Sequence, residues 1–356
     1  MTNKLIKLES LRGFAALYVV LYHLFGSGLI LFGLNFTFLF KFGQEAVILF
    51  FILSGFVINY SFEKSKDKSF KLYFSKRFFR IFIPLIIVFI TNYLLLSLNN
   101  KDWVTVDWKN LIGNLFMLQD ISISKPAVLF DSFLDNLPLW SLSYEWWFYI
   151  LFFIFFKIFK KDISLKVYII TIFAAITYLI VPNFINREVM YLSIWWMGGD
   201  ISRLYAKKKE INFTNLKFPI ITIFIITIIL LFNIYIQNKL DLSKLSGLFC
   251  FHPWAEFRHF FTTLIIISVA LIWKKLKWFG FDYTFGFFKI FAPISFVLYI
   301  SHYFLIISAK YLNPFIENFI LRTITYFIIC IIFSYVVEMI IYVKLNKLIM
   351  NKLFPK

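Results

Sequence analysis

The chain has 356 residues, of which 61% are hydrophobic, 22% aromatic and 16% charged. An average soluble domain has about 25% charged residues, so this composition excludes an ordinary water-soluble protein and favours one that lies in a membrane. The formal net charge of +18 comes from short clusters of Lys and Arg between apolar runs, not from one basic face, so nucleic acid is not an expected partner. Cys250 and Cys330 lie in apolar surroundings without zinc-ligand spacing, so neither a disulfide framework nor a metal site is expected.

Apolar stretches long enough to cross a bilayer recur along the whole chain, because about 20 helical residues match a hydrocarbon core of about 30 Å. Ten are predicted, at residues 9–32, 45–61, 78–98, 137–157, 165–182, 189–206, 218–237, 257–273, 290–310 and 322–343. The first carries Arg12 and His23 and has no small-residue cleavage site after it, so it is predicted to be a retained helix. The sequence thus predicts an all-α integral membrane protein, a bundle of about ten transmembrane helices forming a single domain over residues 1–356.

The basic residues predict an orientation, since loops rich in Lys and Arg are retained in the cytoplasm. Most of the 37 Lys and Arg residues fall in segments 1–7, 61–80, 157–166, 203–217, 274–289 and 344–356. These segments are the two ends of the chain and every second connection, so both termini are predicted to be cytoplasmic. The longest connection on the opposite side, residues 99–136, is predicted to be an extracytoplasmic loop and a candidate lid or acceptor surface.

Titratable residues inside the predicted spans are candidates for chemistry, because a charge there costs about 2.5–3.5 kcal/mol and usually faces a cavity or a partner. Arg12 and His23 are about three helical turns apart, so both lie on one helix face, separated by roughly 16 Å. Glu145 lies in the fourth predicted span, with Ser141 one turn away as an expected hydroxyl neighbour. His302 lies in the ninth, and we expect the two histidines and Glu145 at one depth.

His23 is the predicted general base, because a neutral imidazole can take the proton of an attacking hydroxyl when a neighbouring group holds its tautomer. Glu145 is predicted to be that orienting group, and His302 is a third predicted catalytic residue. The structural alternatives are a buried His bonded to a backbone carbonyl and a Glu paired with a Lys.

Arginines gather at the predicted cytoplasmic mouth. Arg77 and Arg80 are three residues apart and lead into the third span, and Arg12 begins the first. Guanidinium groups bind phosphates bidentately, so these three are predicted to hold the phosphates of a nucleotide-bearing donor. The alternative is a set of positive charges that only anchors the helices. Glu338, in the tenth span, is a possible ion-pair partner for one of these arginines.

A second polar cluster lies at the outer end of the eighth span and contains His252, Glu256, Arg258 and His259. It is predicted to be a solvated loop, with a place at the acceptor entrance as the alternative. In the second span, Ser54 and Gly55 are small residues that permit close approach of another helix.

Five motifs in order along the chain resemble the acyltransferase-3 family of membrane acyltransferases. They are residues 9–16 followed by His23, residues 50–56, residues 76–81 with Pro84, residues 140–142 with Glu145, and residues 294–302. Pro84 lies four residues after Arg80, where many members have it three after, and Glu338 lacks the following Pro often found there.

The resemblance covers nearly the whole chain and implies a ten-helix O-acyltransferase in the cytoplasmic (inner) membrane of a prokaryote. It implies transfer of an acyl group, with acetyl as the leading expectation, from cytoplasmic acyl-coenzyme A to a hydroxyl of an extracytoplasmic carbohydrate or glycoconjugate. It also implies essential roles for Arg12, His23, Arg77 and Arg80.

A transporter or polysaccharide exporter is the competing class, since buried charges also mark substrate pathways. The sequence does not show the paired halves with interrupted helices that are common in transporters. The sequence does not identify the acceptor, the acyl group or the oligomeric state. It also does not distinguish direct transfer from an acyl-enzyme intermediate.

Overall fold

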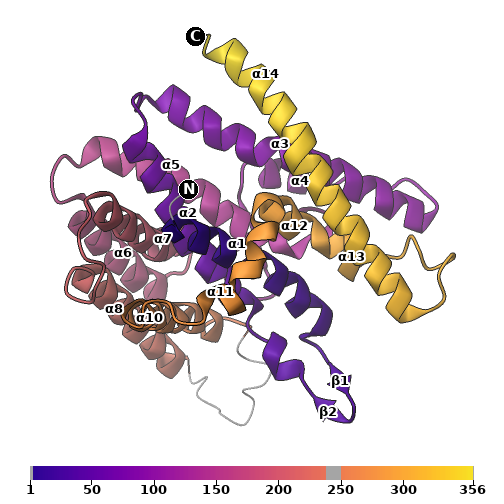
Figure 1. Ribbon diagram of the computed structural model, residues 1–356, viewed down its shortest axis with the longest axis horizontal. Helices are drawn as coiled ribbons and strands as arrows, with labels where there is room; N and C mark the ends of the chain where they lie inside the picture. The colour runs from indigo at the N-terminus through magenta and orange to yellow at the C-terminus, as the bar shows by residue number, and fades with distance from the viewer. Residues whose placement is uncertain (1–2, 238–249, 356) are drawn as a thin grey trace.

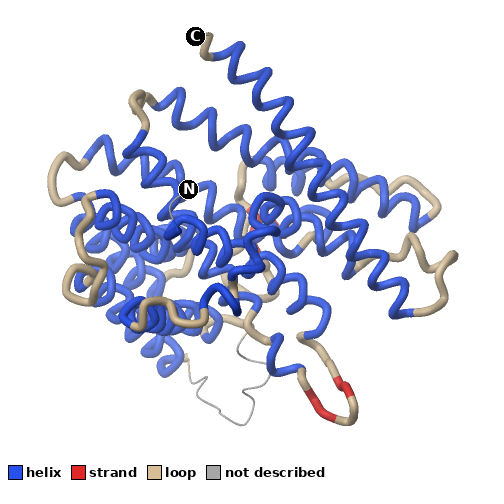
Figure 2. The backbone as a smooth tube through the Cα atoms, viewed as in Figure 1, coloured by secondary structure: helices blue, strands red, loops and turns tan. Residues whose placement is uncertain are grey.

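The computed structural model of the protein describes residues 3–237 and 250–355, and helices make up most of this part (Figure 2). The α-helices are α1 (Asn3–Phe25), α2 (Gly43–Lys64), α3 (Phe70–Asn100), α4 (Trp108–Leu115), α5 (Trp140–Ile158), α6 (Ile163–Ile180), α7 (Phe184–Ala206), α8 (Lys217–Ile236), α10 (Trp254–Lys275), α11 (Phe281–Thr284), α12 (Ser295–His302), α13 (Phe319–Tyr335) and α14 (Val343–Leu353).

Shorter elements connect or extend these helices. The 3₁₀ segments are η1 (Thr37–Phe40), η2 (Phe133–Asp135), η3 (Leu137–Leu139) and η5 (Gly286–Ile294), and the π-helical segments are η6 (Tyr303–Ile307) and η7 (Val336–Tyr342). Strands β1 (Ile30–Leu31) and β2 (Leu34–Asn35) pair antiparallel, and β3 (Gln119–Asp120) and β4 (Phe130–Asp131) pair parallel.

In the described part of the chain, eight helices are long and apolar enough to cross a membrane. They are Thr37–Lys64, Phe70–Asn100, Leu137–Ile158, Ile163–Ile180, Lys217–Ile236, Trp254–Lys275, Gly286–Ile307 and Phe319–Leu353. The first and sixth predicted spans overlap α1 and α7, helices of 23 residues each that are not among these eight. The all-α membrane class is therefore confirmed, while the number of crossings and the side of the termini stay predictions.

The first span ends earlier than predicted. α1 stops at Phe25, and residues 26–35 form a turn and the β1–β2 hairpin instead of two further helical turns. Gly26, Gly28 and Gly33 interrupt the helix, and Gly33 has a φ of +77°, which a glycine adopts without steric cost. His23 consequently lies in the last turn of α1, not near its middle.

The ninth span is not one continuous α-helix. It begins as the 3₁₀ segment η5, which contains Pro293, and proline lacks the N–H that an α-helical interior requires. Only Ser295–His302 is α-helical, and the π-helical segment η6 follows at once. His302 is thus the last residue of α12, and π-helical turns are frequent at functional sites.

Helices α1, α2 and α5 lie between two groups of helices (Figure 1). Helices α6, α7, α8 and α10 pack together on one side, and α3, α12, α13 and η7 lie on the other. Helices α2 and α7 approach closely, because a Cβ atom on Gly55 would lie 1.8 Å from the Trp195 carbonyl oxygen. The small-residue contact predicted for the second span is therefore confirmed.

The predicted outer loop, residues 99–136, is folded against the bundle by buried charges. Lys125 Nζ lies 2.9 Å from Asp120 Oδ1, and the Tyr144 hydroxyl donates to Asp120 Oδ2 at 2.7 Å. Arg187 Nε of α7 lies 3.2 Å from the same Oδ2 atom. Burial lowers the pKa of Lys125, and the nearby Asp120 carboxylate opposes this effect in part.

Candidate active site

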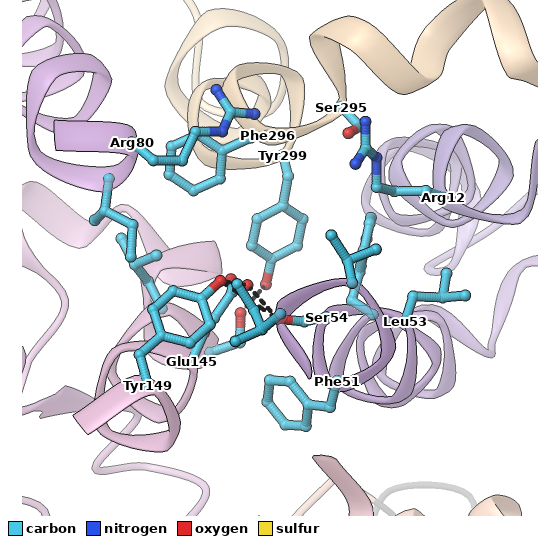
Figure 3. Close-up of a pocket in the computed structure, with 16 residues that line it drawn as sticks. Arg12, Phe51, Leu53, Ser54, Arg80, Glu145, Tyr149, Ser295, Phe296 and Tyr299 are labelled. Atoms are coloured by element: carbon cyan, nitrogen blue, oxygen red, sulfur yellow. Dashed lines mark hydrogen bonds between the residues drawn. The ribbon is translucent and has the colours of Figure 1, made fainter. Parts of the chain in front are cut away.

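A cavity of about 220 Å³, the central cavity, lies between α1, α2, α3, α5 and α12 (Figure 3). Its wall combines aliphatic and aromatic side chains with a smaller number of polar ones, a mixture typical of small-molecule sites. The polar lining residues are Arg12, Ser54, Arg80, Ser141, Glu145, Tyr149, Ser295 and Tyr299. Five of the elements that the sequence motifs pick out therefore meet at one cavity.

One face of α5 supplies Ser141, Glu145 and Tyr149 at spacings of four residues, so all three line the central cavity. The Ser54 hydroxyl of α2 donates to Glu145 Oε1 at 2.7 Å, and the Tyr149 hydroxyl donates to the same oxygen. Trp195 Nε1 of α7 donates to Ser54 Oγ at 3.2 Å. The carboxylate is thus held by hydroxyl groups from two helices.

The hydroxyl neighbour predicted for Glu145 was Ser141, and the structure gives Ser141 a different partner. Ser141 Oγ lies 2.7 Å from the Tyr299 hydroxyl, which donates to the Pro138 carbonyl at 2.9 Å. Ser141 thus connects α5 to α12. Sequence spacing gave the correct face of α5 but could not show that α2 and α12 would contact it.

The two predicted catalytic histidines contact each other. His302 Nε2 lies 3.1 Å from His23 Nδ1, although the residues come from opposite ends of the chain. His302 Nδ1 lies 2.7 Å from the Tyr299 carbonyl oxygen, and His23 Nδ1 lies 3.0 Å from the Val19 carbonyl oxygen. Both rings are therefore fixed by backbone groups of their own helices.

These contacts determine the tautomers of the neutral rings. A carbonyl oxygen only accepts hydrogen bonds, so Nδ1 of His302 carries a proton and its Nε2 is an acceptor. Nδ1 of His23 faces two acceptors, the Val19 carbonyl and His302 Nε2, so it also carries a proton. His23 Nε2 is left unprotonated, which is the state that a general base requires.

The structure does not bring Glu145 to His23. Among the described residues, His302 forms the side-chain hydrogen bond to His23, and it therefore takes the place predicted for the carboxylate. Neither histidine lines the central cavity, but Tyr299 lies between the cavity and the histidine pair. Its side chain lines the cavity, and its ring lies 6.1 Å from the His302 ring, centre to centre. Glu145 and the histidine pair thus form two neighbouring groups and not one triad.

A second cavity of about 400 Å³, the mouth cavity, adjoins the first, and Ile58, Arg80 and Tyr149 line both. Lys76 and Arg77 also line the mouth cavity. The two cavities together follow α3 and α5 from a basic entrance to the polar face of α5. The sequence had grouped these basic residues from their spacing alone.

The three predicted phosphate-binding arginines lie at this end of the bundle, each with a protein partner. Arg12 Nη2 donates to the Ala292 carbonyl at 2.8 Å, and Arg77 Nη2 donates to Ser61 Oγ at 3.0 Å. Arg80 forms an ion pair with Glu338, as expected for one of these arginines. Arg12 and Arg80 line the central cavity, whereas Arg77 lines only the mouth cavity.

The solvated loop predicted for residues 252–259 is wrong. Residues from Trp254 onward form α10, and Glu256 and His259 are 0% and 1% exposed. Glu256 Oε1 accepts from the Tyr178 hydroxyl at 2.7 Å, and His259 Nδ1 lies 2.7 Å from the Tyr191 hydroxyl. Tyrosines from α6 and α7 therefore replace the water that the sequence pattern suggested.

Comparison with known proteins agrees with the fold and the cavity. A family model described as an acyltransferase domain matches residues 5–343, which include the whole lining of the central cavity and the histidine pair. No curated protein and no solved structure matches the chain. The protein is a membrane acyltransferase and belongs to the acyltransferase-3 family.

Proposed function

We propose that the protein transfers an acyl group, acetyl in the first instance, from cytoplasmic acyl-coenzyme A to a hydroxyl of an extracytoplasmic carbohydrate or glycoconjugate. The observation that carries this proposal is the pair of joined cavities, basic at one end and in contact at the other with Tyr299, the neighbour of His302. A donor with phosphates at one end and a thioester at the other fits these cavities, with the phosphates at the basic end and the thioester near Tyr299.

The phosphates of the donor bind at the mouth cavity. Lys76, Arg77 and Arg80 line it, and arginine suits phosphate because its planar fork makes two parallel hydrogen bonds. Arg12 faces the central cavity from α1 on the other side (Figure 3). The uncharged pantetheine arm of the donor then lies in the central cavity, with the thioester toward Tyr299.

The acceptor hydroxyl attacks the thioester carbon while His23 Nε2 takes its proton. The C–S bond then breaks, an ester forms, and the leaving thiolate receives the proton from His23 to give free coenzyme A. His302 acts as a positioning residue, because its Nε2 accepts from His23 Nδ1 and so keeps Nε2 of His23 basic. Direct transfer needs one general base, and the histidine pair supplies it.

The test uses the full chain purified into lipid nanodiscs with radiolabelled acetyl-coenzyme A. Transfer or hydrolysis of label is compared between wild type, His23→Ala and Arg80→Ala. The control is Lys160→Ala, because Lys160 is exposed between α5 and α6 and lines neither cavity. We expect His23→Ala to bind coenzyme A but not to transfer, and Arg80→Ala to bind it more weakly.

Normal transfer by His23→Ala would overturn the assignment of the base. Label that stays on the protein through denaturation would replace direct transfer by an acyl-enzyme intermediate. A wild-type protein that binds no coenzyme A would favour the exporter.

A further inference from the structure

Glu145 is a carboxylate inside a membrane helix without a basic partner among the described residues. Both of its described hydrogen bonds, from Ser54 and from Tyr149, go to Oε1. Oε2 has no hydrogen bond to the described part of the protein, and Glu145 lines the central cavity. A carboxylate in this setting is costly and usually marks a place where a ligand binds.

The hydroxyl groups around Glu145 already donate their protons to acceptors within the protein. Ser54 and Tyr149 donate to Glu145, and Tyr299 donates to the Pro138 carbonyl. Around Glu145, between the guanidinium groups of Arg12 and Arg80, the wall therefore offers lone pairs to a ligand and few protons. A matching ligand group carries N–H or O–H donors and no negative charge, because a second anion beside Glu145 would be repelled.

The positions of Tyr149, Glu145 and Ser141 along α5 determine the order in which an elongated ligand would contact them. Tyr149 lies at the border of the two cavities, Glu145 lies one turn further, about 6 Å along the axis, and Ser141 lies one turn beyond it. Ser141 contacts Tyr299, whose carbonyl oxygen contacts His302. A chain that runs from Arg80 to Tyr299 passes Glu145.

We infer that Glu145 binds the pantetheine arm of the donor by accepting a hydrogen bond from one of its amide N–H groups at Oε2. This inference rests on the proposed function, and it replaces the role of orienting His23 that the sequence suggested for Glu145. The pantetheine arm carries two secondary amides and no charge, so it supplies the neutral donors that this wall lacks. Glu145 thereby recognises the middle of the donor, between the phosphates and the thioester.

The experiment compares two ligands that differ by the arm. Dissociation constants of coenzyme A and of adenosine 3′,5′-bisphosphate are measured by calorimetry for wild type, Glu145→Gln and Arg80→Ala in nanodiscs. The Gln side chain keeps an oxygen for Ser54 and Tyr149 but turns an N–H₂ group toward the arm. We expect Glu145→Gln to bind coenzyme A about ten- to a hundredfold more weakly and the bisphosphate as wild type does.

Binding of the bisphosphate by Glu145→Gln also shows that this variant is folded. Arg80→Ala serves as the contrast and weakens both ligands, because it removes a phosphate contact. Equal weakening of both ligands by Glu145→Gln, or of neither, would overturn the inference while the proposed function stands. If wild type binds neither ligand, the inference and the proposed donor are both wrong.

Discussion

His302 Nε2 and His23 Nδ1 lie 3.1 Å apart, and 279 positions separate the two residues in the sequence. The contact joins the last turn of α1 to the last residue of α12. Because each Nδ1 faces a backbone carbonyl, His23 donates to His302 in the neutral pair. The unprotonated nitrogen that can act as a base is therefore Nε2 of His23. The contact predicts different consequences for changes at the two histidines.

His302→Gln is expected to lower kcat about 10- to 100-fold without changing the dissociation constant of coenzyme A. The reason is that His302 positions His23, so its loss should remove part of the roughly 10²–10⁴-fold that a general base contributes. His23→Ala is expected to abolish transfer, and the double variant to be no worse than His23→Ala, since the residues act as a unit. Single-turnover transfer together with calorimetric binding measures these effects. If the two losses of kcat multiply in the double variant, the two histidines do not act as a unit.

The sequence predicted where the long helices lie, because they are apolar runs separated by charged residues. It also predicted His23 and His302 at one depth from their positions along their spans, and the two side chains contact each other. It could not predict how each helix is rotated about its axis. For that reason Glu145 was expected to face His23, whereas it faces Ser54 of α2.

The polar segment of α10 shows a second limit of sequence reasoning. His252, Glu256 and His259 within eight residues suggested a solvated loop, because local composition contains no information on distant partners. Their partners, Tyr178 and Tyr191, come from α6 and α7, and both were counted only as parts of apolar spans. Buried polar networks need partners from several helices, and a single sequence does not show which helices are neighbours.

Glu338→Ala is expected to destabilise the protein by about 1–3 kcal/mol. Glu338 pairs with Arg80 and also accepts from the Val297 backbone N–H at 2.9 Å, so its removal leaves two groups unpaired. The loss is smaller than the 3–5 kcal/mol of a fully buried pair because the Arg80 side chain is 34% exposed. Thermal unfolding in one detergent measures it, with the exposed Glu317→Ala as the matched control. Equal unfolding temperatures for the two variants would contradict the structural role of the pair.

Lys125 is expected to make stability depend on pH in the alkaline range. Burial lowers its pKa below the ordinary value of 10.5 in the folded protein. Between that lowered pKa and about 10.5 the unfolded chain binds more protons, so the stability contributed by this group rises with pH. Lys125→Met should lose this rise and should also be less stable near pH 7, where Asp120 loses a cationic neighbour.

The measurement for Lys125 is the unfolding temperature at several pH values, with Lys109→Met as the control. Lys109 lies in the same loop, but its side chain is exposed where that of Lys125 is buried. Parallel pH profiles for wild type and Lys125→Met would show that Lys125 does not contribute in this way.

Gly55→Ala and Gly198→Ala are expected to destabilise the protein, each by about 1–3 kcal/mol from overpacking. A Cβ on Gly55 would lie 1.8 Å from the Trp195 carbonyl oxygen, and one on Gly198 would lie 2.0 Å from the Ile52 carbonyl oxygen. Both obstacles are backbone atoms, so α2 and α7 would have to move apart. Alanine favours a helix over glycine by about 1 kcal/mol, which means that a measured loss must come from the contact between the helices.

Gly199→Ala is the matched control for these two variants, because Gly199 also lies inside α7 and a Cβ there meets its nearest atom at 3.6 Å, an ordinary contact. Thermal unfolding in lipid nanodiscs should separate the two interface variants from this control. Movement of α2 would also displace Ser54, which holds Glu145, so both interface variants should bind coenzyme A more weakly than the control does. Interface variants that unfold with the control would show that α2 and α7 can separate without loss. Weaker binding without a loss of stability would place the whole effect at the central cavity.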